Sequence, residues 1–361
     1  MINFLLVAML QLSSSSIPIA INTGSGEGSS YGLDDYAAGI GITIEIAPGV
    51  EMPVINNGAC FFPNKEDPRE TVATTKWIDG GRGLDTAYSY NNQVVVGKAI
   101  AAASPAVRKE LFQTTKVPGG RNASYALQIV KADIAMLGVK TVDLVLMHSP
   151  GKGGPGMAKR ILDTYAGLEQ ALDEGLTRAI GVSNFKVVHL NVLKGAKLKH
   201  KPSVNQCFFA VGNHNDAAVA LGKTMDITYA AYSPLGPFCE PVGNCSKPVL
   251  VDPTVKAITK KHNVSSAEVA MRWIVQQGHA IVTASAVAAY DVEDITGIFK
   301  FGLTADEMAK LTAFNSTAAG TVAIKTDDVV GETRASRAAG DTAGVAMDQR
   351  VTHSAGSRTG S

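Results

Sequence analysis

This chain has few cysteines, few aromatic residues and almost no net charge. Its 361 residues include four cysteines, aromatic residues make up 6%, and the formal net charge is +1. Recognition of nucleic acid or an anionic membrane calls for an excess of positive charge, which the composition lacks. The spacing of cysteine and histidine gives no metal-binding motif. These absences exclude strongly basic and metal-dependent classes and favour a small molecule as the partner.

The N-terminal apolar segment is short. It reads MINFLLVAML over residues 1–10, and small residues follow up to Ala20. Spanning a bilayer takes about 20 apolar residues, whereas a secretory signal peptide needs fewer. We therefore expect a signal peptide over residues 1–20, a location in the secretory pathway or outside the cell, and no membrane association after its removal. The alternatives are a disordered or strand-forming leader and a cytoplasmic protein.

Four Asn-x-Ser/Thr triplets agree with a secreted glycoprotein, because this triplet is the acceptor for N-glycosylation. They begin at Asn122, Asn244, Asn263 and Asn315. Cys239 and Cys245 flank a turn-rich loop that suits either a short disulfide or two free thiols. Cys60 and Cys207 lie in apolar surroundings and are expected to be small core residues.

The succession of strand-like and helix-like segments predicts one large domain. Residues 21–41 are rich in Gly and Ser and are expected to form a linker, and residues 319–361 have the composition of a disordered tail. Between them, residues 42–318 alternate apolar strands with helical patterns, as in a parallel sheet with crossover helices. The expected strands are 53–58, 83–86, 111–116, 144–149, 179–184, 203–209, 227–233 and 280–285. Eight such units predict an α/β fold of the closed (β/α)8 type, a TIM barrel.

Two of the expected helices carry boundary signals. After Asn122 apolar residues recur at helical spacing, and Gly138 follows as a stop. Ser265 and Glu268 form a capping box before a second apolar run. The apolar positions are Leu127, Val130, Ile134 and Leu137 in the first helix and Ala270, Trp273 and Ile274 in the second. Both helices are predicted to pack on the sheet as scaffold.

Polar side chains end three successive expected strands. Asp85 ends the second strand, Lys116 the third and His148 the fourth, and Tyr90 follows Asp85 by five residues. Reactive groups gather at the C-terminal ends of the strands in a barrel of this kind. Singly, each residue has an ordinary explanation as a turn former, a packed ring or a solvated charge. Their joint occurrence predicts a shared site.

The four side chains suit the protonation of a developing alkoxide. A tyrosine hydroxyl has a pKa of about 10 and is a poor acid at neutral pH, but a neighbouring ammonium group lowers that pKa. We predict that Lys116 supplies this charge to Tyr90 and that Asp85 holds the lysine. His148 would hydrogen-bond a substrate carbonyl oxygen and orient it.

Five segments, in this order, resemble the motifs of the aldo-keto reductase family. They are GRGLDTAYSYNNQVVVGKAI at 81–100, LVLMHSP at 144–150, GLTRAIGVSNF at 175–185, KPSVNQ at 201–206 and AYSPLG at 231–236. The resemblance extends from about Ile42 to Phe314. It implies a monomeric barrel that uses NADPH or NADH to reduce a small-molecule aldehyde or ketone.

The resemblance also implies roles for single residues. Asp85, Tyr90, Lys116 and His148 correspond to the family's catalytic tetrad. The residues implied to bind the cofactor are Ser183, Asn184, Gln206, Tyr232, Ser233, Leu235 and Ser285. The first three would hydrogen-bond the nicotinamide carboxamide, Tyr232 would stack on its ring, and Ser233 and Leu235 would line the pyrophosphate and its loop.

The stretch after the eighth strand departs from the family's pattern. The family usually has a Lys and often an Arg there for the adenosine 2′-phosphate, whereas residues 282–299 contain neither. Ala284 stands in place of the Lys and Tyr290 near the Arg. The acidic residues of this stretch are Asp291, Glu293 and Asp294. They either repel a phosphate and accept from a free ribose hydroxyl, which favours NADH or weak binding, or they cap the next helix.

The substrate end also departs from the family. Ser149 stands where Trp is common, Phe208 replaces a usual Glu, and NNGAC at 56–60 replaces the common GLGTW. We expect a wider and less selective pocket, partly narrowed by Phe61 and Phe62.

Two other function classes follow from these departures. A catalytically weak or inactive barrel that senses nucleotides or binds a partner is the second hypothesis, because the phosphate region is altered. A barrel hydrolase would need paired carboxylates or clustered metal ligands at the strand ends, and Asp85 has no such partner there.

Overall fold

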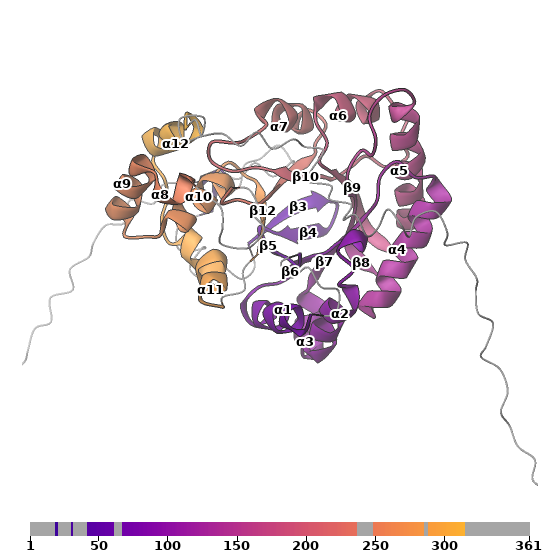
Figure 1. Cartoon of the computed structure of the whole chain (residues 1–361), viewed down its shortest axis with the longest axis horizontal. Helices are drawn as coiled ribbons and strands as arrows, with labels where there is room; N and C mark the ends of the chain where they lie inside the picture. Colours follow the sequence, from indigo (N-terminus) through magenta and orange to yellow (C-terminus); the bar gives the residue numbers. More distant parts are fainter. Residues whose placement is uncertain are drawn as a thin grey trace, which may run out of the picture. The chain divides into compact units, whose positions relative to one another are not determined.

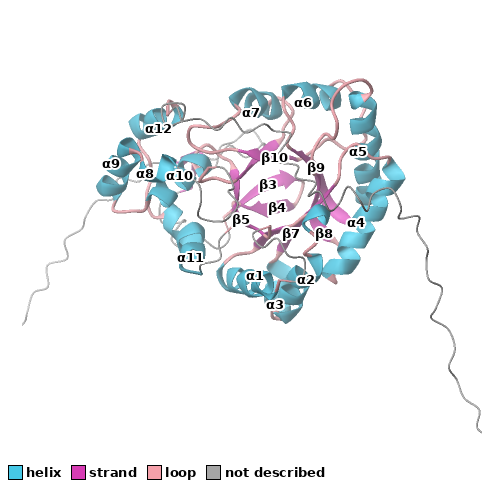
Figure 2. Cartoon of the chain, viewed as in Figure 1, coloured by secondary structure: helices cyan, strands magenta, loops and turns pink. Residues whose placement is uncertain are grey.

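Eight parallel strands form a closed barrel in the computed structural model, which describes residues 19–20, 30–31, 42–60, 67–236, 248–284 and 288–314. The barrel strands are β5 (Ile55–Gly58), β6 (Gly83–Asp85), β7 (Phe112–Val117), β8 (Val142–Met147), β9 (Thr177–Ser183), β10 (Val204–Phe208), β11 (Thr228–Tyr232) and β12 (Ala280–Thr283). Each strand pairs with the next along the chain, and β12 closes the ring on β5. Figure 2 shows the strands at the centre of the molecule with helices outside them. The predicted TIM barrel is confirmed, with strand limits that differ by a few residues.

Helices alternate with the strands and surround the barrel (Figure 1). They are α1 (Pro68–Gly80), α2 (Gln93–Ala102), α3 (Pro105–Glu110), α4 (Ala123–Leu137), α5 (Met157–Asp173), α6 (Val187–Lys194), α7 (Asp216–Lys223), α8 (Pro248–Val251), α9 (Pro253–His262), α10 (Ser266–Val275), α11 (Ala288–Thr296) and α12 (Ala305–Thr312). The structure also has two 3-10 turns, η2 (Tyr88–Tyr90) and η3 (Gly297–Phe299), and a short antiparallel pair, β1 (Ile19–Ala20) with β2 (Ser30–Tyr31).

The two helices with boundary signals begin where the sequence predicts. The side chain of Asn122 accepts from the backbone of Tyr125 at the start of α4, and Gly138 ends that helix at φ 69°. Only glycine takes this left-handed conformation at little cost, so the stop has a physical cause. Ser265 and Glu268 form the predicted capping box of α10.

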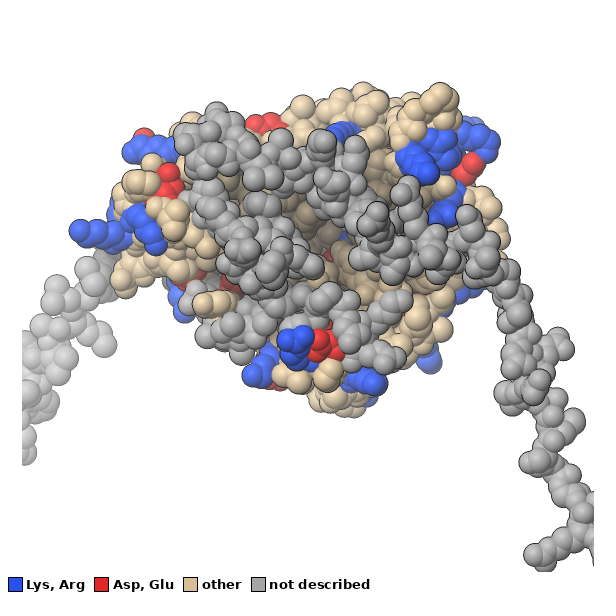
Figure 3. All heavy atoms as spheres, viewed as in Figure 1, with Lys and Arg blue, Asp and Glu red and all other residues tan. Residues whose placement is uncertain are grey.

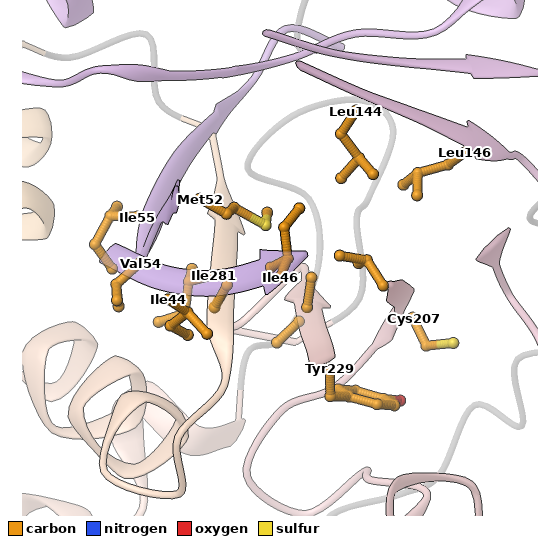
Figure 4. Packing of buried hydrophobic residues seen from close by; sticks show 14 of the residues in the cluster. Ile44, Ile46, Met52, Val54, Ile55, Leu144, Leu146, Cys207, Tyr229 and Ile281 are labelled. Atoms are coloured by element: carbon orange, nitrogen blue, oxygen red, sulfur yellow. The ribbon is translucent and has the colours of Figure 1, made fainter. Parts of the chain in front are cut away.

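An antiparallel hairpin at the N-terminal ends of the strands was not predicted. It consists of β3 (Thr43–Ala47) and β4 (Val50–Pro53), and Arg178 at the start of β9 donates to the Gly49 carbonyl in its turn at 2.6 Å. Ile44, Ile46 and Met52 are buried and lie among side chains of the barrel interior in Figure 4. Because apolar side chains fill this end, the polar groups of the barrel are left at the opposite, C-terminal end.

Several predictions fall outside the described residues. They are most of the signal peptide and of the linker, the C-terminal tail, the Cys239–Cys245 loop and the triplets at Asn244 and Asn315. Within the described part, Cys60 and Cys207 are free, and Cys60 is exposed, so its predicted place in the core is wrong. No helix among the described residues is long and apolar enough to cross a membrane.

Candidate active site

The three polar strand ends meet at the C-terminal end of the barrel. Asp85 is the last residue of β6, Lys116 lies one residue before the end of β7, and His148 follows β8 directly. The register aligns Asp85 with Thr114 and Lys116 with Leu146 on neighbouring strands. Parallel pairing therefore brings residues that are 31 to 32 positions apart to one edge of the barrel.

A buried ion pair forms the floor of the site. The Lys116 ammonium group contacts Oδ1 of Asp85 and donates to the Thr86 carbonyl at 3.0 Å. Gln206 donates from its amide to Oδ2 of Asp85 at 2.7 Å. The Lys116 and Asp85 side chains are 1% and 2% exposed. Both charges are thus compensated by short polar contacts, as burial requires.

Tyr90 joins this pair from a turn after β6. Its backbone N–H donates to the Ala87 carbonyl at 2.9 Å, and Asn91 ends the turn in the left-handed conformation at φ 55°. The Lys116 nitrogen lies 5.1 Å from the centroid of the Tyr90 ring, and the His148 ring meets that ring edge to face at 5.5 Å. The structure therefore brings all four predicted side chains together.

The ionisation of Tyr90 differs from our prediction. Lys116 directs its charge to Asp85, and its contact with Tyr90 is with the aromatic face. Burial raises the pKa of the Tyr90 hydroxyl well above its ordinary value, and the negative charge of Asp85 adds to the effect. The net shift of the Tyr90 pKa is therefore upward, whereas we predicted a downward shift. The hydroxyl is a neutral hydrogen-bond donor at neutral pH.

His148 is also held neutral. Burial and the nearby Lys116 charge lower the pKa of its imidazole to about 3. Its Nδ1 lies 3.1 Å from the Ser89 hydroxyl, and Asn184 donates to its backbone carbonyl at 2.8 Å. If Ser89 donates to Nδ1, then Nε2 carries the hydrogen of the neutral ring and is a donor.

A second group of polar side chains adjoins the tetrad from β9, β10 and β11. Ser183 donates to the Gln206 carbonyl at 2.7 Å, and the Asn184 amide lies 3.2 Å from the Ser183 oxygen. The Tyr232 hydroxyl donates to the side-chain amide oxygen of Asn184 at 2.8 Å. Asn184 and Ser233 have positive φ values of 62° and 53°. Four of the predicted cofactor residues, from Ser183 to Tyr232, thus form one hydrogen-bonded cluster.

Known proteins are similar to this chain in sequence and in fold. The model of the aldo/keto reductase family matches residues 63–316. An aldo-keto reductase of Mycolicibacterium vanbaalenii is 34% identical over 264 residues, which cover 72% of this chain and 87% of that protein. The chain belongs to the aldo-keto reductase family. A glyoxal reductase of Bacillus subtilis is 33% identical over 277 residues, 76% of this chain and 92% of that one.

A solved structure of the family has the same barrel. The Bombyx mori aldo-keto reductase in complex with NADP superposes with a TM-score of 0.67 and 26% identity, and the match covers 76% of this chain and 92% of that chain.

Two acidic residues of this aldo-keto reductase after β12, Asp291 and Asp294, are buried. Asp291 and Asp294 are each 6% exposed, and Asp294 accepts from the Thr283 hydroxyl at 3.1 Å. Burial raises the pKa of Asp291 to about 6, and Lys76 of α1 opposes the shift. Both residues lie within α11, Asp291 in its first turn, and neither presents an exposed acidic surface. The expectation that they meet a phosphate or a ribose is not supported by this placement.

The remaining predicted residues of this region are only partly described. Ala284 is half-buried and Tyr290 is 55% exposed, so the two positions that would hold cations in the family carry none. Ser285 and the side chain of Glu293 lie outside the described residues. Leu235 packs against the core at the edge of the site.

Three of the predicted substrate-end positions lie in the described part. Phe208 meets the Tyr232 ring edge to face at 6.0 Å. Ser149 is half-buried beside His148, and Cys60 is exposed at the end of β5. Phe61 and Phe62 lie outside the described residues, so their predicted contribution stays a prediction.

Three supporting residues were missed from the sequence. The Thr86 hydroxyl donates to Asn92 at 2.7 Å, and Asn92 donates to the Ala59 carbonyl, which joins β5 to the Tyr90 turn. Gln93 donates to the Ala87 carbonyl at 2.7 Å. The signal available was polar residues, Asn92 and Gln93, at the start of an apolar helix.

Figure 3 shows how charge is distributed on one face. Lysine and arginine side chains of the described residues lie in separate groups around its rim, and acidic side chains accompany several of them. This distribution agrees with the net charge of +1.

Proposed function

We propose that this chain is a nicotinamide-dependent reductase that converts an aldehyde or ketone to an alcohol, with Tyr90 as the proton donor. The observation that carries the proposal is the meeting of Tyr90, neutral His148 and the buried Lys116–Asp85 pair at one end of the barrel. A hydroxyl and an imidazole beside each other can both hydrogen-bond one carbonyl oxygen.

The polar cluster next to the tetrad fits a nicotinamide. A carboxamide both donates and accepts, and Ser183, Asn184 and Gln206 offer hydroxyl and amide groups of both kinds. A hydrogen bond to Asn184 fixes the Tyr232 ring, so the ring presents a rigid aromatic face. A solved relative from Bombyx mori holds NADP. When bound, the nicotinamide supplies the hydride of the reaction.

The raised pKa of Tyr90 suits a proton donor for this direction of reaction. Its hydroxyl remains protonated until the carbonyl oxygen gains charge, and an alkoxide is basic enough to take the proton. The phenolate that remains faces Lys116, whose charge stabilises it. His148 stays neutral over the physiological range, so it hydrogen-bonds the oxygen without competing as an acid.

Replacement of Tyr90 by Phe tests the proposal. The ring contacts with Lys116 and His148 do not involve the hydroxyl, so the variant should fold and bind cofactor as the wild type does. Loss of a general acid lowers the rate about 10²- to 10⁴-fold. We expect the kcat for an activated aromatic aldehyde to fall by this factor. A variant that retains wild-type turnover would refute the assignment.

The preferred cofactor is open to a direct titration. Ala284 offers no cation, and Asp291 and Asp294 are turned into the protein, so we propose that the site discriminates weakly against NADH. Quenching of nicotinamide fluorescence by wild-type protein should give dissociation constants for NADH and NADPH within about tenfold of each other. A preference of more than a hundredfold for NADPH would contradict the proposal.

The same titration, combined with an assay of carbonyl turnover, separates an enzyme from a binding barrel. The altered phosphate region favours, as the second candidate, a catalytically weak protein that senses nucleotides or binds a partner. Tight binding without turnover of any aldehyde or ketone would support this candidate, because the tetrad would then be present without a productive substrate pocket.

Location and assembly are separate proposals. We propose that residues 1–20 direct the chain to the secretory pathway, where the triplet at exposed Asn263 is open to glycosylation, and that the protein is a monomer. Expression with a reporter, N-terminal sequencing of the mature chain and light scattering would test these points. An intact N-terminus on a cytoplasmic protein would reject the first.

A further inference from the structure

Asp133 is a buried carboxyl group that the proposed reaction does not use. It lies on the inner face of α4 and has no exposed surface. Its Oδ2 accepts a hydrogen bond from the Thr115 hydroxyl. Among the described residues, no group lies within hydrogen-bonding geometry of its Oδ1. A carboxyl group with an unsatisfied oxygen is costly to bury, so its presence calls for a reason.

The surroundings of Asp133 connect it to both halves of the tetrad. Thr115 directly precedes Lys116 on β7. Gln93 also faces Asp133 and favours its charged form, although the contact is looser than a well-formed hydrogen bond. The Gln93 amide donates to the Ala87 carbonyl, which also accepts the backbone N–H at the end of the Tyr88–Tyr90 turn. Asp133 thus contacts the strand that carries Lys116 and the residue that holds the tyrosine turn.

We propose that Asp133 is a positioning residue that keeps the Lys116 strand and the Tyr90 turn in their relative places, and that its charge controls how readily Tyr90 gives up its proton. The proposal rests on the proposed function, because it concerns proton donation in that site. Asp133 itself contacts neither substrate nor cofactor in it.

The groups around Asp133 place its change of charge near neutrality. Burial raises the pKa of its carboxyl to about 7, and Thr115, Gln93 and Lys116 oppose the shift. On the turn η2, the pKa of Tyr88 is raised by burial and by the nearby Tyr125 hydroxyl and Asp133 carboxyl groups. Within the described residues, neither α2 nor α5 adds a charged group to the shift of Asp133. Among the described residues, Lys116 is therefore the only charged group that contributes to the shift of the Asp133 pKa.

Ionisation of Asp133 should make Tyr90 a weaker acid. A second negative charge near Lys116 adds to that of Asp85 and offsets the field that stabilises a phenolate. The kcat of the wild type should therefore fall by about threefold as the pH rises through 7, since general acids follow Brønsted behaviour. The KM should stay constant, because Asp133 does not touch the substrate.

Steady-state kinetics from about pH 5 to pH 9 test the coupling, with 4-nitrobenzaldehyde as the probe and saturating NADPH or NADH. We expect Asp133→Asn to lose the inflection near pH 7. Thr115→Val removes a hydrogen bond that favours the charged carboxylate, so the inflection should move to higher pH. Asp163→Asn, on the exposed side of α5, is the matched control and should keep the wild-type profile. Superimposable profiles of Asp133→Asn and wild type would overturn the proposal.

A second measurement does not depend on turnover. With ¹³C-labelled tyrosine, the Tyr90 ring signal, assigned by Tyr90→Phe, should shift with a midpoint near pH 7 in the wild type and not in Asp133→Asn. If Asp133→Asn does not fold, the wild type and Thr115→Val still decide, because the midpoint must be present in one and raised in the other. A titrating signal without carbonyl turnover rejects only the proposed function. The absence of titration rejects the role of Asp133, whatever the activity.

Discussion

Removal of one partner from the Lys116–Asp85 pair should have a cost that depends on pH. Lys116→Met deletes the cation and leaves the Asp85 carboxylate in a site where the original side chains are 1% and 2% exposed. Gln206 still donates to Oδ2 of Asp85 at 2.7 Å. One neutral hydrogen bond does not replace an ion pair, so the carboxyl group is expected to bind a proton on folding.

The cost of that proton sets the magnitude. Protonating an ordinary aspartate takes about 4 kcal/mol at pH 7 and about 1.5 kcal/mol at pH 5. The first figure agrees with the cost of breaking a buried ion pair, which is roughly 3–5 kcal/mol. In a domain of this size it corresponds to a fall of roughly 8–16 °C in the unfolding midpoint at pH 7, and the fall should be roughly 3–6 °C at pH 5. The sign follows from linkage: the folded variant binds a proton that the unfolded chain releases, so its stability relative to wild type rises as the pH falls.

Thermal unfolding followed by circular dichroism at both pH values gives the comparison. Lys159→Met removes a lysine from an exposed pair with Asp163 and is the control, for which no measurable shift is expected. Adding Asp85→Asn to Lys116→Met removes the stranded charge, so the double variant should regain stability at pH 7. The reasoning is refuted if Lys116→Met unfolds with the wild type, or if its deficit is the same at both pH values.

Three further predictions concern single residues. The wild type should lose stability as the pH falls from about 6.5 to 3, because the unfolded chain takes up a proton on His148 that the folded protein resists. His148→Gln should lose less stability over this range, which urea titrations at several pH values would measure. The pKa of Glu307 is lowered to about 2, chiefly by contacts with Lys261 and the Thr304 backbone. Its carboxylate therefore stabilises the fold above about pH 4.5, and this stabilisation is lost as the pH falls toward 2. Glu307→Gln should therefore cost about 1–3 kcal/mol at pH 7 and roughly 40% of that at pH 3, measured in the same way. Ala284→Lys should strengthen the binding of NADPH relative to NADH by about tenfold in a fluorescence titration, and unchanged relative affinities would show that the phosphate lies elsewhere.

The barrel and the tetrad were predictable from the sequence for a local reason. Apolar runs mark the strands, and a parallel barrel brings every strand end to one edge, so Asp85, Lys116 and His148 needed no distance information to be grouped. The hairpin before β5 could also have been found. In TIEIAPGVEMP, apolar residues alternate with polar ones on both sides of Gly49, which has a positive φ of 71°.

The electrostatics of the site could not be predicted in the same way, because they depend on which groups share a charge. The sequence places Lys116 near Tyr90 but does not say that Asp85 and the Thr86 carbonyl take its hydrogens, which leaves burial to raise the pKa of Tyr90. Asp133 is a stronger case. In the sequence it is one polar position in an amphipathic helix, and only the fold places its carboxyl against Thr115, 18 residues away. The sign of a pKa shift thus follows from contacts between strands and helices. The sequence alone therefore identifies the residues that we propose to react, whereas the contacts of Asp133 are found only in the structure.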